Sequence, residues 1–161
     1  AKYVAVIYVK INPEFNIYLD KDENVVALEC LNADAKDAYG KKSFAGKSLD
    51  ETLQTVVSIA AEEGYMKEDQ TVALTITECT TDLNATELQT KMDRMVTEAA
   101  KEQDITVTTA MDMSEEVRTA QKEAGLIKQA CSNCNGTGDC PDCPVCGGSF
   151  KCVVCGGSGT L

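Results

Sequence analysis

The alternation of apolar and polar residues predicts that the chain begins with three strands. Residues 3 to 11 are rich in β-branched and aromatic side chains and stop at Asn12-Pro13, which is typical of a buried strand followed by a turn. Residues 15 to 19 alternate apolar and polar side chains, and residues 25 to 31 form a further apolar run beyond a polar turn. Together they predict an antiparallel meander. One face of its third strand carries Val26, Leu28 and Cys30.

Capping residues and helical spacing predict two amphipathic helices further along. Ser48 and Glu51 fit a capping box, and apolar residues then recur at helical spacing until Gly64. Asn84 and Glu87 repeat the capping pattern ahead of a second such segment. The two apolar stripes consist of Leu49, Leu53, Val56, Val57 and Ala60, and of Leu88, Met92, Met95, Val96 and Ala99.

The remaining elements complete a mixed architecture. Strands are predicted at residues 71 to 79 and 105 to 110, a short helix at residues 32 to 39, and a last helix from Ser114 to Gly125. The fold class is therefore α+β with mixed α/β layers, in which an antiparallel meander is followed by α-β-α-β-α. We expect the helices on one side of the sheet.

Composition narrows the possible functions. A chain of 161 residues suffices for one core and a small appendage. Its formal charge of -11 opposes a phosphate backbone, so nucleic acid is not expected as a partner. The chain has no His, which excludes His-based catalytic triads and His metal ligands. A bound metal must therefore be held by Cys, carboxylate or backbone groups.

The nine cysteines divide the chain into two parts. Cys30 and Cys79 stand alone and are expected to be small buried hydrophobes, whereas the other seven lie between Cys131 and Cys155. We therefore predict one domain at residues 1–127 and a Cys-rich module at residues 128–161. No apolar run is long enough to span a membrane, and the chain begins at Ala1 without a secretion signal, as expected of an excised piece.

An ordered series of segments resembles a known family over roughly residues 3 to 127. The series comprises Ile11-Asn12-Pro13, Val25-Val26-Ala27-Leu28, Leu31-Asn32-Ala33-Asp34, Phe44-Ala45-Gly46-Lys47-Ser48-Leu49, Glu63-Gly64-Tyr65 and Ala120 to Leu126. It is similar to the extracytoplasmic domain of RsgI-type transmembrane anti-sigma factors. The resemblance implies an extracytoplasmic signalling or regulatory domain with a protein partner. A membrane anchor is expected upstream of Ala1, and a cytoplasmic sigma-binding segment beyond it.

The same resemblance implies self-cleavage between Asn12 and Pro13. The Asn12 amide nitrogen can attack its own main-chain carbonyl, which gives a succinimide and releases the Pro13 nitrogen, if the fold strains that peptide. Such a domain is at most a single-turnover enzyme. Two positions depart from the family pattern, because Lys10 replaces an acidic residue and Glu14 replaces a Ser. From the dipeptide alone, Asn12-Pro13 is a turn between two strands.

A carboxylate-rich stretch at residues 20 to 24 offers a different kind of site. It lacks the Gly and the terminal Glu of a helix-flanked calcium loop. We therefore expect a solvated hairpin there.

The C-terminal segment contains three Cys-x-x-Cys-x-Gly units, and two of them continue as Gly-x-Gly. Two intervening residues let both thiolates of a unit reach one Zn2+, and the glycines permit the turns around it. The segment resembles the zinc-binding repeat of DnaJ-type co-chaperones, which implies that the outermost units share one zinc. The implied ligands of that site are Cys131, Cys134, Cys152 and Cys155.

Three further cysteines leave the metal count open. A second site at Cys140, Cys143 and Cys146 needs Asp139, Asp142 or an outside ligand to close it, and we favour two sites over one. Disulfides or an iron-sulfur cluster are the alternatives, although seven thiols cannot pair completely. A structural zinc module is expected whether the protein is extracytoplasmic or cytoplasmic. The alternative to an extracytoplasmic signalling domain is a soluble, cytoplasmic protein. It would bind zinc and act as a protein-interaction or chaperone-like module without catalytic activity.

Overall fold

A computed structural model describes residues 2–127. The first compact unit of the chain runs from Ala1 to Gln121, and the elements described below lie in it except for the last two residues of the final helix. The predicted zinc ligands, from Cys131 to Cys155, lie outside the described residues. The division of the chain at residue 127 therefore stays a prediction.

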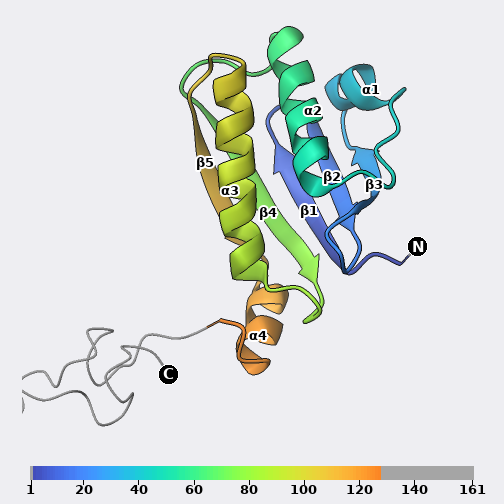
Figure 1. Ribbon diagram of the computed structural model, residues 1–161, viewed down its shortest axis with the longest axis vertical. Helices are drawn as coiled ribbons and strands as arrows, with labels where there is room; N and C mark the ends of the chain where they lie inside the picture. The colour runs from blue at the N-terminus through green and yellow to red at the C-terminus, as the bar shows by residue number, and fades with distance from the viewer. Residues whose placement is uncertain (1, 128–161) are drawn as a thin grey trace, which may run out of the picture. The chain divides into compact units, whose positions relative to one another are not determined.

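Within residues 2–127, five strands, the number that the sequence predicts, form one mixed sheet (Figure 1). Their order in space is β3-β2-β1-β4-β5, which makes β1 the central strand. β1 pairs antiparallel with both β2 and β4, β2 pairs antiparallel with β3, and β4 pairs parallel with β5. The strands are β1 (Ala5–Lys10), β2 (Glu14–Leu19), β3 (Val25–Cys30), β4 (Gln70–Cys79) and β5 (Val107–Met113).

The helices begin at the capping residues that the sequence indicates. The side chain of Ser48 accepts a hydrogen bond from the backbone N–H of Glu51, and that of Asn84 accepts one from Glu87. The predicted short helix forms too, with Asn32 as its cap. The four helices of the described residues are α1 (Ala33–Tyr39), α2 (Leu49–Glu62), α3 (Ala85–Glu102) and α4 (Glu115–Glu123).

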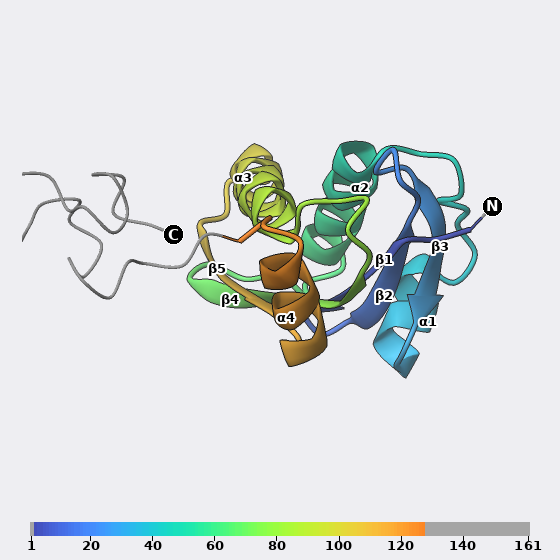
Figure 2. The same ribbon diagram turned by 90° about the horizontal axis from the view of Figure 1, so that it is seen from below.

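The core lies between the sheet and the two long helices. Figure 2 shows α2 and α3 side by side on one face of the sheet. Ile7 on β1 is fully buried and lies opposite Ile17 on β2 and Ile76 on β4. Both predicted apolar stripes face this layer; Met92 is fully buried, while Met95 is half-buried. The mixed α+β class is therefore confirmed. No helix within residues 2–127 combines the length and the apolar character needed to cross a membrane.

Two local expectations were wrong. The fifth strand begins at Val107 rather than at residue 105 and continues to Met113. The backbone N–H of Ile105 instead donates to Ala100 at 2.9 Å, because it closes the end of α3. Cys30 and Cys79 are half-buried free thiols rather than fully buried ones.

Candidate functional site

Asn12 lies in the tight turn between β1 and β2. Lys10 and Glu14 form the last pair of the ladder, and the backbone N–H of Ile11 donates to the Pro13 carbonyl at 3.1 Å across the turn. This closure places Asn12 in the left-handed region, with φ at 65°. Asn tolerates that region better than most residues, yet such conformations still store strain. The Asn12-Pro13 peptide is thus held in a strained turn at the end of the central strand.

A second asparagine holds the side chain of Asn12. Asn32, the cap of α1, donates from Nδ2 to Oδ1 of Asn12 at 3.1 Å. Its own Oδ1 accepts from the backbone N–H of Ala35 at 2.9 Å and from that of Glu14 at 3.2 Å. One short polar side chain therefore joins the turn, the start of β2 and the start of α1.

The Glu14 carboxylate lies in the same network. Tyr8 donates its hydroxyl to Oε1 of Glu14, and Asn32 Nδ2 lies 3.4 Å from Oε2. The hydrogen bond to Glu14, assisted by burial, raises the pKa of Tyr8 to about 12. Tyr8 therefore stays protonated and keeps donating to Glu14 throughout the neutral range.

The turn is accessible from solvent on one side. Asn12 is exposed, whereas Ile11 and Pro13 on either side of it are buried. The carbonyl of Ile11 accepts a hydrogen bond from Nε2 of Gln70 at 2.8 Å, which ties the turn to β4. An open pocket beside the turn is lined by Ile11, Asn12, Gly64, Tyr65, Lys67 and Gln70. Water therefore reaches the Asn12-Pro13 bond, at which the family resemblance implies cleavage, while Ile11 and Pro13 on either side of Asn12 are buried.

Sequence reasoning found Asn12 and Pro13 but missed the groups that hold them. Asn32 lies 20 positions away, and although it belongs to one segment of the family resemblance, nothing in the sequence indicated its contact with Asn12. The contact between Tyr8 and Glu14 arises because both side chains emerge on one side of the β1–β2 hairpin, where only the register brings them together.

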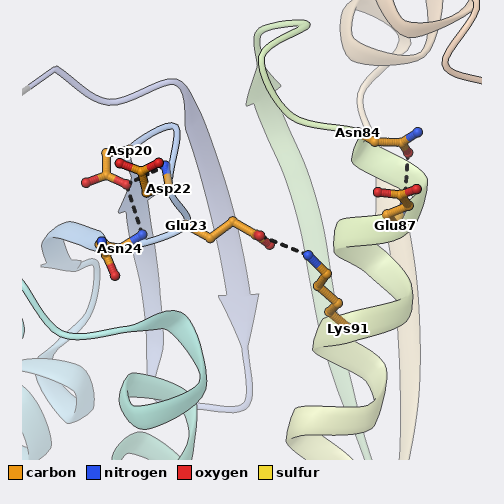
Figure 3. A network of polar contacts seen from close by, with 7 residues as sticks. All are labelled: Asp20, Asp22, Glu23, Asn24, Asn84, Glu87 and Lys91. Atoms are coloured by element: carbon orange, nitrogen blue, oxygen red, sulfur yellow. Dashed lines mark hydrogen bonds and ion pairs between the residues drawn. The ribbon is translucent and has the colours of Figure 1, made fainter.

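The carboxylates near residue 20 form a hairpin turn, as expected (Figure 3). Oδ1 of Asp20 accepts from the backbone N–H groups of Asp22 at 2.9 Å and Asn24 at 3.0 Å. Glu23 forms an ion pair with Lys91 of α3 at 2.9 Å. Within the part of the chain that the structure describes, no three Cys, Asp or Glu side chains are grouped to hold a metal ion.

Two comparisons with known protein sequences bear on the family of this chain. The family model described as the anti-sigma factor RsgI-like central domain matches residues 4–131. Anti-sigma-I factor RsgI of Bacillus anthracis is 31% identical over 75 residues, which cover 46% of this chain and 17% of that relative. The class is thus that of proteins with an anti-sigma factor RsgI-like central domain. Within it, the chain belongs to the RsgI-like family and contains the family's central domain. The chain matches less than a fifth of the curated relative's length.

Proposed function

We propose that this chain is the extracytoplasmic signalling domain of an RsgI-like anti-sigma factor, and that its Asn12-Pro13 bond cleaves itself once. The proposal includes a membrane anchor before Ala1 and a sigma-factor-binding segment on the other side of the membrane. The observation that supports the proposed cleavage is the left-handed backbone conformation of Asn12, with φ at 65°, together with the hydrogen bond from Asn32 to its side chain.

The reaction is an intramolecular displacement without a change of oxidation state. Nδ2 of Asn12 forms a bond to the Asn12 carbonyl carbon, and the bond from that carbon to the Pro13 nitrogen breaks. Nδ2 loses one proton to water and the Pro13 nitrogen gains one from water. Water then opens the succinimide to a carboxylate. Strain in the turn favours the reaction because cleavage releases it.

Cleavage between Asn12 and Pro13 divides the chain directly after the central strand β1. Every residue of β1 is paired with a residue of β2 and with one of β4. Ile7 and Val9 of β1 are buried beneath the helices. The two pieces therefore stay together at rest, because separation requires both ladders to open and this apolar surface to be exposed. A pull on the segment before Ala1 is the kind of signal that such an assembly transmits.

The cleavage is tested with the full chain and with Asn12→Ala. On denaturing electrophoresis we expect wild type to yield residues 1–12 and 13–161, and Asn12→Ala to remain one polypeptide. Asn16→Ala is the matched control, since Asn16 lies on β2 and donates to Glu29 instead. A folded wild-type chain that stays intact after prolonged incubation would contradict the proposal.

We further propose that the C-terminal segment binds structural zinc through Cys131, Cys134, Cys152 and Cys155. A second ion is proposed at Cys140, Cys143 and Cys146. The support is the Cys-x-x-Cys spacing within each unit, together with the resemblance to the DnaJ-type repeat, which implies that the outermost units share one ion. Four thiolates complete a closed tetrahedral site without an open position for water. Native mass spectrometry should show bound zinc that chelation removes. A metal-free chain lighter by several pairs of hydrogens would indicate disulfides and refute this part.

A further inference from the structure

We infer that Asn32 is a positioning residue for cleavage of the Asn12-Pro13 bond, an inference that rests on the proposed function. It is the residue whose side chain reaches the reacting side chain of Asn12, through the bond from Nδ2 to Oδ1 at 3.1 Å. Asn32 forms no covalent bond during the reaction. It acts by holding and polarising the amide that does.

The orientation of the Asn32 amide is fixed by its other contacts. Its oxygen faces two backbone donors, the N–H of Ala35 at 2.9 Å and the N–H of Glu14 at 3.2 Å. A flipped amide would direct its NH2 group at both donors and leave them without an acceptor. The NH2 group of Asn32 must therefore face Asn12, where its partner is the amide oxygen.

This hydrogen bond favours the nucleophile in two ways. Fixing Oδ1 of Asn12 also fixes Nδ2, because the amide is planar, and so limits the rotamers that the attack must select from. As Nδ2 loses its proton, negative charge develops on Oδ1, and a donor already aimed at that oxygen stabilises the charge. A dipole placed in advance contributes to the rate without reorganising during the step.

The same residue makes cleavage depend on the docking of α1. Asn32 caps α1, and α1 is anchored by Tyr39, whose ring packs edge-on against Phe15 and whose hydroxyl donates to the Val56 carbonyl at 2.8 Å. The donor therefore reaches Asn12 only after α1 has packed against β2 and α2. Premature cleavage of an unfolded chain is thereby disfavoured.

The test separates the donor from the helix cap. Asp is as good a cap as Asn, so Asn32→Asp keeps the acceptor for Ala35 but places a carboxylate oxygen against Oδ1 of Asn12. Refolded from denaturant at pH 7.5, this variant of the full chain should cleave roughly 10- to 100-fold more slowly than wild type. The matched control is Asn84→Asp, which changes the cap of α3 in the same way and should cleave at the wild-type rate.

The pH profile distinguishes positioning from a structural role. The carboxyl group that Asn32→Asp introduces can donate again once it is protonated. The deficit of this variant relative to wild type should therefore narrow several-fold between pH 7.5 and pH 5, as the new carboxyl nears its usual pKa of about 4. Asn32→Ser keeps a neutral cap without the long donor and should stay slow at both pH values. It also replaces Asn32→Asp if that variant fails to fold.

Two results would overturn the inference in distinguishable ways. If wild type cleaves and Asn32→Asp matches its rate, or if the deficit does not change with pH, the positioning role is wrong and the proposed function stands. If folded wild type never cleaves, both the positioning role of Asn32 and the proposed self-cleavage are wrong.

Discussion

Oε1 of Gln121 accepts a hydrogen bond from the backbone N–H of Ala85 at 2.9 Å, although the two residues are 36 positions apart. Ala85 begins α3, where the first N–H groups have no partner within the helix. Nε2 of Gln121 donates to the carbonyls of Leu83 at 2.9 Å and Thr80 at 3.4 Å. Its side chain is fully buried, so α4 is joined to the connection between β4 and α3 by one satisfied amide.

Replacing Gln121 should destabilise the domain according to which bonds are lost. Gln121→Met removes the acceptor of the buried Ala85 N–H and a donor to the Leu83 and Thr80 carbonyls, and we expect a loss of about 1–3 kcal/mol in unfolding free energy. Gln121→Glu should cost more at pH 7, because a carboxylate oxygen then faces two carbonyls, and less at pH 5, where the acid can donate. Urea unfolding measures both. Gln54→Met, on the exposed side of α2, is the control and should change stability little.

The bond between Tyr8 and Glu14 predicts an alkaline limit to stability. The hydrogen bond from Tyr8 to Glu14 raises the pKa of Tyr8 to about 12. The folded state therefore holds the proton of the Tyr8 hydroxyl more tightly than the unfolded state does. The resulting stabilisation is fully present below pH 10 and is lost as the pH rises through 12. Tyr8→Phe should therefore be less stable than wild type at pH 9 and converge with it only above pH 12. A difference independent of pH would contradict this assignment.

The Cys79 thiol should react slowly while the domain is folded. Burial raises its pKa to about 11, which lowers the thiolate fraction near pH 8 by about 100-fold relative to an ordinary Cys. Iodoacetamide labelling followed by peptide mapping measures this thiol apart from those of the C-terminal segment. Native labelling should be slower than labelling in denaturant by at least that factor. Equal rates would show that Cys79 is exposed to solvent.

The central position of β1 predicts strong protection against hydrogen exchange. Its amides lie between two ladders, whereas β3 forms the edge of the sheet. In the Asn12→Ala chain, amides of Ile7 and Val9 should exchange only through global unfolding, and those of β3 should exchange faster. The same ordering is expected after cleavage, because the ladders remain. Faster exchange in β1 than in β3 would mean that the strand is not held as described.

The sequence was most informative where structure depends on local pattern. The meander, the Ser48 and Asn84 caps and the buried stripes follow from alternation and capping chemistry within a few residues. The bounds of β5 were missed because Ile105 completes the end of α3, and because the parallel pairing with β4 extends the strand to Met113. That pairing joins segments far apart in the chain.

The candidate site shows the same limit. Asn12-Pro13 is visible as a dipeptide, but its contact with Asn32 depends on how α1 docks beside the hairpin, which no local pattern specifies. Gln121 belongs to the Ala120 to Leu126 segment of the resemblance, but nothing indicated that its side chain is buried, since a Gln in an amphipathic helix is ordinarily exposed. Buried polar contacts between distant segments are therefore what the structure adds to the sequence.

The most direct test of the account is the intact mass of the full chain under native and then denaturing conditions. We expect one native species with the mass of the whole chain, allowing for bound zinc and the water added on succinimide opening. Denaturation should then release a peptide of residues 1–12 from residues 13–161. An unbroken Asn12-Pro13 bond under denaturing conditions, in a chain shown to be folded, would contradict the central claim.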